Sequence, residues 1–351
     1  LLKGRVVAEE KIWPVHFQQG MFNMTSDSEQ FITRSELEKN GWKASKLNRW
    51  QRTVEGKKEE AVPLYEGKMV QMYDHRAADV VVNSANLHRA AQQESIPDGV
   101  KQAFDRLPAS QYWVKTSALK PGDDRWVVAF KDVTAPTNMR TMIASILPTH
   151  CVGNTLPLLV SDDTDYSASA ACVLLANLAS FALDFVARQK VQGQHLNWFI
   201  VEQLPMIAPA RFDAPLASLR RGASTGSART ADEKTIASFI GAEVLALTYT
   251  AHDMAPFARD MGYVDAKGNV LPPFVWDAED RAHRMARLDA VFMKLYGLSE
   301  DDSRYVLSTF PIVQRQDEAA YGRYRTRDLI LGYMRSLAAG TLSHDNLDDR
   351  A

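Results

Sequence analysis

The residues most able to do chemistry lie close together in the segment 63–76, PLYEGKMVQMYDHR. Leu64, Met69 and Met72 are apolar enough to hold this segment against a core. Its polar side chains must then pair with one another or face a polar ligand, because unpaired charges are costly to bury. Two interpretations follow: a structural ion pair around a turn at Gly67, or a linked polar cluster beside a recognition surface. The polar side chains are Glu66, Lys68, Asp74, His75 and Arg76.

A second pattern could support nuclease chemistry. Metal-dependent nucleases use an Asp and a Glu-x-Lys pair to hold magnesium and a water molecule. So short a pattern also arises by chance in a chain with 24% charged residues. A magnesium-dependent nuclease therefore stays an alternative. The three Glu-x-Lys pairs are Glu9/Lys11, Glu55/Lys57 and Glu66/Lys68.

A third pattern, in residues 41–60, interleaves Trp42 and Trp50 with six lysines and arginines. Aromatic rings among cations can stack on bases while the charges follow phosphates. The same residues could equally form a solvated basic surface whose tryptophans cover the edge of the core. Both interpretations stay open at the level of sequence.

The motifs of a methyltransferase catalytic domain are missing. Amino-methyltransferases need a glycine-rich loop for S-adenosylmethionine and an Asn/Asp-Pro-Pro-aromatic motif for the flipped base. The nearest string is VLPPF at 270–274, which has leucine where the polar residue belongs and reads as a turn. Walker, HExxH and nucleophile-elbow motifs are also absent, and the histidines show no ligand spacing with the cysteines. We expect no cofactor, no metal and no catalytic residue in this chain.

Composition indicates a globular protein and narrows its setting. The 351 residues are 46% hydrophobic and 9% aromatic, which is enough for a real core. Cys151 and Cys172 are too few for a disulfide framework, which suits a reducing cytoplasm, and no apolar run reaches membrane-spanning length. The chain starts without methionine and without a signal peptide, so we expect a fragment of a longer protein.

Charge is distributed unevenly along the chain, although the net charge is only −2. Residues 1–150 carry 21 Lys+Arg against 18 Asp+Glu, whereas residues 231–351 carry 14 against 19. A polyanion should therefore meet the first two thirds of the chain. The excess is modest, so a basic groove must come from placing charges on one face.

The first half of the chain reads as strands with one short helix. The helix covers residues 31–40 and ends at Gly41, where glycine can take the left-handed conformation. Asn138 and Arg140 lie where the third strand of the hairpin region begins, and their side chains can make bidentate contacts to adenine and guanine edges. A polar strand start capped by its own asparagine is the alternative. The expected strands are 5–8 (extending to 13), 112–115, 126–133, 140–147 and 156–160.

The second half reads as helices. Residues 167–190 carry a core-facing stripe of Leu174, Leu178, Phe181 and Phe185. In the last turn of this helix, Arg188 could cap the helix dipole or contact a ligand. Residues 208–230 contain small and basic residues with little core material, as in a linker. Further helices are expected at 232–250, 277–296, 299–311 (with a Ser299/Asp302 capping pair, closed by Pro311) and 317–337.

These elements predict an α+β fold: a mixed-sheet recognition domain (1–207), a linker (208–230) and a smaller all-helical domain (231–351). The three arginines Arg323, Arg325 and Arg327 on the last helix could grip a phosphate backbone, or be solvated or ion-paired.

Four ordered blocks resemble a known family. PLYEGKMVQMYDHR, residues 126–148, residues 178–205 and residues 272–331 resemble the target-recognition region of bacterial adenine-specific DNA methyltransferases of the type IIG restriction-modification and phage-defence kind. The resemblance covers the chain from about residue 41 onward. Lys131 departs from it, since the family's block has arginine there. The RQKVQGQHLN turn also resembles the end of a recognition domain in type I specificity subunits, which draws attention to Arg188, Gln189, Gln194 and His195.

The resemblance implies sequence-specific recognition of double-stranded DNA for a methyltransferase domain of the same polypeptide. That domain would precede this chain and bind S-adenosylmethionine, and the fragment alone would have no activity. The alternatives are the nuclease and a protein-docking module of a phage-defence complex, which would use the helical domain. We expect DNA-binding residues among Lys68, Asp74, His75, Arg76, Lys115, Lys120, Arg125, Lys131, Asn138, Arg140, Arg188, Gln189, Lys190 and His195.

Overall fold

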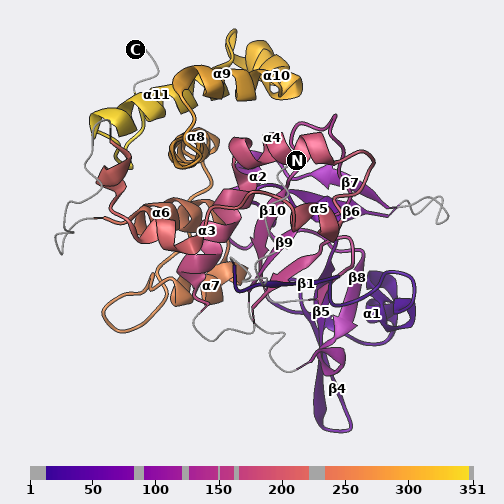
Figure 1. The fold of residues 1–351 in the computed structure, drawn as a ribbon. Coiled ribbons are helices and arrows are strands. Elements are labelled where there is room, and N and C mark those ends of the chain that lie inside the picture. Colours follow the sequence, from indigo (N-terminus) through magenta and orange to yellow (C-terminus); the bar gives the residue numbers. More distant parts are fainter. Residues whose placement is uncertain are drawn as a thin grey trace.

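Strands occupy the first half of the protein and helices the second, in a computed structural model that describes residues 13–82, 91–120, 126–148, 151–161, 166–220 and 234–347. The predicted α+β class is confirmed (Figure 1). The strand expected at 5–8 lies outside the described residues. The described strands are β1 (His16–Gln18), β2 (Ile32–Thr33), β3 (Lys43–Ala44), β4 (Trp50–Val54), β5 (Lys57–Tyr65), β6 (Ala78–Val81), β7 (Gln92–Ser95), β8 (Tyr112–Lys115), β9 (Val127–Phe130), β10 (Ala144–Leu147), β11 (Cys151–Val152) and β12 (Leu158–Val160).

Two larger sheets and one hairpin contain these strands. The first sheet is antiparallel, in the order β1-β12-β9-β10. The second has the order β2-β8-β5-β4-β3, and β11 pairs with β5 in parallel. β6 and β7 form a separate antiparallel pair. Strand β5 changes character along its length: its first residues are exposed in a hairpin with β4 that projects from the body, and its last five are buried (Figure 1).

The described helices begin and end at residues whose side chains explain these limits. Thr33 caps α1 with Glu36 in a capping box, and Ser299 does the same for α9 with Asp302. Asp277 accepts the N–H of Asp280 at the start of α8. The helices are α1 (Arg34–Lys39), α2 (Asp98–Lys101), α3 (Ala168–Ala179), α4 (Phe181–Lys190), α5 (Trp198–Val201), α6 (Ile236–Thr248), α7 (Ala255–Asp260), α8 (Ala278–Leu295), α9 (Glu300–Ser308), α10 (Pro311–Tyr321) and α11 (Arg325–Ala339).

Two helices expected to be continuous are broken. The expected helix 167–190 is α3 and α4, bent by 58° at Ser180. Ser180 has extended backbone, and its hydroxyl accepts the N–H of Leu183, so it caps a new helix instead of continuing the old one. The expected helix 317–337 is α10 and α11, separated at Gly322, whose φ of 70° is left-handed. Pro311 begins α10 at its first turn, where proline is tolerated.

One hydrophobic cluster spans both predicted domains. It includes Phe130 from β9, Leu174 from α3, Phe239 from α6 and Phe292 from α8. Helix α3 packs against both β10 and α6. Phe212, inside the expected linker, is 2% exposed in this cluster and belongs to the short 3-10 helix η4 (Pro209–Asp213). The described part of that segment, 208–220, is therefore packed rather than extended; residues 221–230 lie outside the described residues.

Helix length and composition also bear on membranes. Within the described ranges, no single helix is long and apolar enough to span a bilayer; the bent pair α3 and α4 passes that test only when the two are taken together.

Candidate nucleic-acid interface

Segment 63–76 runs from the buried end of β5 into the interior. Leu64 and Met69 are fully buried, as expected from their apolar character. Glu66 is also buried, and its Oε2 lies 3.2 Å from the ammonium of Lys68. This pairing joins the two charged residues of one of the three Glu-x-Lys patterns.

Arg76 is a buried structural side chain. It has no exposed surface, and its guanidinium donates hydrogen bonds of 2.9–3.2 Å to four backbone carbonyls, those of Lys101, Ala103, Arg106 and Thr250. Burial lowers the pKa of this guanidinium. Since the four carbonyls belong to the turn around α2 and to the loop after α6, Arg76 joins segments that are far apart in sequence. We correct the expectation that it contacts DNA.

Asp74 and His75 are likewise turned inward. Asp74 lies 2.6 Å from the ammonium of Lys101 and accepts the backbone N–H of Arg76 at 2.8 Å. The Nε2 atom of His75 lies 3.0 Å from the carboxylate of Asp253, and both side chains are almost fully buried. Both belong to the interior of the fold, so their assignment to a DNA-facing surface is also corrected. The physical reason is that every charge has a partner inside the fold.

Arg140 is buried as well, and it anchors the loop that follows β9. Its Nε donates to Asp184 at 2.6 Å, its Nη2 donates to the Ala179 carbonyl, and its guanidinium lies 3.8 Å from the Phe181 ring centre. Asp184 also accepts the backbone N–H groups of Thr141 and Met142. Only 4% of Arg140 is exposed, so the expected contact to a base edge is corrected to an anchoring role.

Arg188 holds the same loop from the other side. One guanidinium nitrogen donates to the carbonyls of Asn138 (2.7 Å) and Met139 (3.2 Å), and the other donates to the Thr309 carbonyl (2.8 Å). The guanidinium also lies 4.1 Å from the Phe310 ring centre. Arg188 therefore binds loop carbonyls in place of the carbonyls of its own helix end. We name residues 131–141 the clamped loop, because Asp184 and Arg188 fix it.

Two polar side chains of the clamped loop, the exposed Asn138 and the half-buried Lys131, have no partner among the described residues. Asn138 is exposed, and among the described residues its side-chain amide has no hydrogen-bond partner. The Lys131 ammonium has no acidic partner among them either, and burial lowers its pKa. Lys131 lies in a pocket of about 290 Å³ together with Lys68, Gln93 and Thr155. The structure thus brings together Lys68 and Lys131, two residues that the sequence places 63 positions apart.

The segment after α4 runs beside the clamped loop. Backbone bonds join Thr134 to Gln194 and Leu196 to Asp132. The imidazole of His195 lies 3.1 Å from Asp132 and is 56% exposed. In the last turn of α4, Gln189 is exposed, and Lys190 donates to Gln203. The predicted residues around 131–140 and 188–195 therefore form one face, which we name the clamped-loop face.

Two further predicted cations, Lys115 and Lys120, lie at the end of β8 and just after it. Lys115, on β8, lies 3.5 Å from Glu59 in the second sheet. Lys120 is exposed just after the 3-10 turn η3 (Thr116–Ala118), and Arg125 lies outside the described residues. Neither described residue, Lys115 or Lys120, belongs to the clamped loop.

The β4–β5 hairpin forms a second basic surface. Trp42 and Trp50 are 5% and 7% exposed, so they cover the core edge and are not free to stack on bases. The guanidinium of Arg52 lies over the Trp42 ring at 4.7 Å. Sequence reasoning missed the groove of about 700 Å³ beside this hairpin; the alternation of polar residues around the Glu55-Gly56 turn could have indicated it. Its polar lining includes Asn40, Lys43, Gln51, Arg52, Thr53 and Lys58.

The described residues contain no group of three or more His, Cys, Asp or Glu side chains placed to hold a metal ion. Several buried titratable groups are paired with protein groups, as His75 is with Asp253 and Glu243 with Arg287. What the clamped-loop face offers chemically is hydrogen bonding and positive charge on a fixed backbone. Comparisons with models of protein families, with curated proteins and with solved structures found no match.

Proposed function

We propose that the chain recognises double-stranded DNA in a sequence-specific manner through the clamped-loop face. One observation carries this proposal: Asn138 and Lys131, which have no partner among the described residues, stand on a single loop that Asp184 and Arg188 fix. A loop that formed only a solvated surface would not need the hydrogen bonds by which Asp184 and Arg188 fix its backbone.

The side-chain types on this face suit a duplex. An asparagine side chain can bind adenine through two hydrogen bonds. Its NH2 group donates to N7, and its carbonyl oxygen accepts from the N6 amino group. A lysine such as Lys131 neutralises phosphates, whereas Lys68 is already paired with Glu66. A loop that is already fixed loses little conformational entropy on binding, and this favours discrimination between bases.

The β4–β5 hairpin gives a second contact surface. A two-stranded ribbon fits the major groove of B-form DNA. Lys43, Lys57 and Lys58 are exposed along this hairpin. Its role in the proposal is to follow the backbone, because Arg52 is engaged with Glu59 and Trp42 and the exposed cations are lysines.

The DNA contact would serve a methyltransferase. On the sequence resemblance, an adenine-specific domain that binds S-adenosylmethionine precedes this chain in a cytoplasmic, bacterial restriction-modification or phage-defence enzyme. The chain would then select the target site, and the preceding domain would transfer the methyl group. Methylation by the chain alone is not expected, since its sequence lacks both motifs for that reaction.

The first test is selection of duplexes from a randomised library, followed by fluorescence anisotropy on the enriched sequence at about 50 to 200 mM salt. Asn138→Ala should reduce preference for the enriched sequence by roughly 1–3 kcal/mol with little change in salt dependence. Lys131→Ala should flatten the slope of log K against log salt by about 0.9 for every sequence.

Lys267→Ala is the matched control, because Lys267 is exposed on a turn of the helical half, away from the clamped loop. It should leave both quantities unchanged. The proposal fails if selection enriches no sequence, or if Lys131→Ala and Lys267→Ala behave alike on the enriched and scrambled duplexes.

A further inference from the structure

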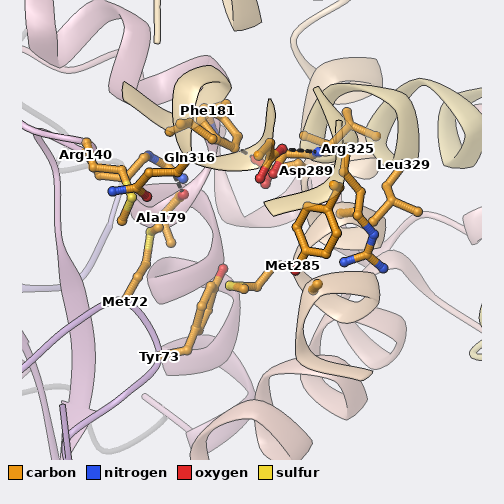
Figure 2. Close-up of a pocket in the computed structure, with 18 residues that line it drawn as sticks. Met72, Tyr73, Arg140, Ala179, Phe181, Met285, Asp289, Gln316, Arg325 and Leu329 are labelled. Atoms are coloured by element: carbon orange, nitrogen blue, oxygen red, sulfur yellow. Dashed lines mark hydrogen bonds between the residues drawn. The ribbon is translucent and has the colours of Figure 1, made fainter. Parts of the chain in front are cut away.

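A cavity of about 220 Å³ lies between the two halves of the protein, and Arg140 is one of its lining residues. Its walls come from the start of α4, from α8, α10 and α11, and from residues 72–73 and 139–140 (Figure 2). Apolar side chains form most of the lining, among them Met72, Phe181, Met285 and Leu329. An apolar cavity of this size would by itself suit a hydrocarbon.

Three buried polar groups make the cavity something other than a void. Asp289 is 6% exposed; one of its oxygens accepts the N–H of Phe181 at 2.7 Å, and the other has no donor among the described residues. Burial raises the pKa of this carboxyl to about 6, so it is mainly ionised at neutral pH. An ionised oxygen facing a cavity needs a donor.

Tyr73 supplies the second group. It is 4% exposed, and its ring points into the space between Arg140, Met285 and Asp289 (Figure 2). No hydrogen bond of its hydroxyl to another described residue exists. Its backbone φ of 56° is unfavourable for a residue with a side chain, and such outliers concentrate at ligand sites.

Arg140 supplies the third group. Its Nε and Nη2 atoms are bound to Asp184 and the Ala179 carbonyl, whereas its Nη1 atom has no acceptor among the described residues. The cavity therefore offers an anionic acceptor, a hydroxyl and a cationic donor, and polar residues of α10 and α11 also line it: Gln316, Asp317, Tyr321, Arg325 and Thr326. Figure 2 shows Arg140 and Asp289 on different sides of the space.

This combination excludes three ligand classes. A hydrocarbon would leave the second oxygen of Asp289, the Tyr73 hydroxyl and the Nη1 atom of Arg140 without a partner. An anion would meet Asp289, and an aliphatic ammonium would meet Arg140, each at low local dielectric. A neutral, planar molecule with a donor facing Asp289 and an acceptor facing Arg140 and Tyr73 satisfies all three groups.

We propose that this cavity binds an amino-substituted nitrogen heterocycle of nucleobase size, with its amino group donating to Asp289 and a ring nitrogen or carbonyl accepting from Arg140 and Tyr73. Met72, Met285 and the Phe181 ring would contact its faces, as thioethers and aromatic rings favour. The proposal does not rest on DNA recognition by the clamped-loop face, although one of its three groups, Arg140, belongs to the clamped loop.

Adenine and cytosine are the probes, and purine, which lacks the amino group, and toluene are the controls. Isothermal titration calorimetry on the full chain should show saturable binding of at least one amino-bearing base. Purine should bind about tenfold more weakly or worse, and toluene should not compete. Because Met139 links the cavity to the clamped loop, a duplex with one unpaired adenine and a fully paired duplex are added as competitors. Competition by the first alone identifies DNA as the source of the base, and competition by neither identifies a free base.

Two variants test the groups themselves. Asp289→Asn keeps a carbonyl for the N–H of Phe181 but replaces the open acceptor by a donor, so affinity for the amino-bearing base should fall about tenfold or more. Tyr73→Phe should weaken it several-fold. Asp301→Asn, the same change on an exposed residue of α9, should leave it unchanged.

Thermal unfolding confirms that each variant is folded before binding is measured. If Asp289→Asn does not fold, Ala282→Met, which places a larger side chain on the half-buried α8 wall of the cavity, takes its place and should abolish binding. The proposal is overturned if neither base saturates below about 1 mM, if purine binds as tightly as adenine, or if folded cavity variants bind like the wild type.

Discussion

Arg76 shows how a charged residue can act through the fold rather than through a ligand. Its four carbonyl partners leave no part of the guanidinium for solvent. Arg76→Ala would leave these carbonyls unpaired in the interior, so we expect the free energy of unfolding to fall by about 3 kcal/mol or more. Urea unfolding followed by tryptophan fluorescence measures this. Arg34→Ala, at a side chain that is 74% exposed, should change it by less than about 0.5 kcal/mol.

Asp289 gives a prediction about pH. Its pKa is about 6 in the fold against 3.8 as the ordinary value, because burial outweighs the attraction of Arg140 and the N–H of Phe181. The folded state therefore holds the proton over a range in which the unfolded state has lost it. Stability is favoured below about pH 4 and is lost as pH rises to about 6, by on the order of 3 kcal/mol.

Comparison with Asp289→Asn isolates this effect from other titrations. The groups facing Asp289 are Arg140, Asp184, Tyr73 and Tyr324, and all are present in both proteins. The difference in unfolding free energy, wild type minus variant, should decrease from pH 4 to pH 6.5 and stay level above it. A difference that is flat across this range would contradict the assignment.

At this scale the sequence predicted that Asp74, His75 and Arg76 are polar groups in need of partners, and could not name those partners. Asp253 lies 178 residues from His75, and Thr250 lies 174 residues from Arg76. No spacing rule reaches across such separations. The unpaired state of Lys131 and of Asn138 is similarly a property of the folded surroundings.

At the scale of secondary-structure elements, two side chains of α4, those of Asp184 and Arg188, hold the clamped loop. The contribution of Arg188 can be tested by itself. Removing its three carbonyl contacts should loosen residues 138–139, so Arg188→Ala should lower discrimination between the enriched and scrambled duplexes several-fold. Stability should fall by about 1–2 kcal/mol. Anisotropy and urea unfolding measure the two effects.

A lysine at position 188 retains charge without the planar fork, so Arg188→Lys should restore the salt dependence of binding but not the discrimination. Arg304→Ala, on the exposed face of α9, is the control and should change neither. If Arg188→Lys restores discrimination in full, the residue contributes charge and does not position the loop.

Elements with strong periodicity and clear caps were predictable. The expected helix at 277–296 is α8, and the Ser299/Asp302 pair caps α9 as expected. The breaks at Ser180 and Gly322 were missed because apolar residues on both sides continue the helical period. At both positions the local pattern of apolar residues favours one continuous helix. The cap formed by Ser180 and the left-handed backbone of Gly322 interrupt the helix instead.

At the scale of the whole molecule, one hydrophobic core extends across the predicted boundary between the two domains. Phe130 and Leu174 from the first half pack in one cluster with Phe239 and Phe292 from the second. Polar contacts cross the same boundary: Arg281 donates to the carbonyl of Tyr73. The change of composition at 208–230 falls between the helices α5 and α6, and composition alone does not distinguish a packed connection from a domain boundary.

This continuity predicts the behaviour of separated halves. In residues 1–207 alone, the guanidinium of Arg76 would lose the Thr250 carbonyl. In residues 231–351 alone, the carboxylate of Asp253 would lose His75. It would then either stay buried without that partner or become exposed to water together with the apolar side chains around it. Each half also loses part of the shared core, at about 25 cal/mol for each Å² of apolar surface exposed to water. Circular dichroism should show no cooperative unfolding for either half, whereas co-expression of both should restore a cooperative transition. A sharp transition and dispersed amide resonances for residues 231–351 alone would show that the helical half folds independently, and that the contacts across α3 and α6 join two domains rather than complete one.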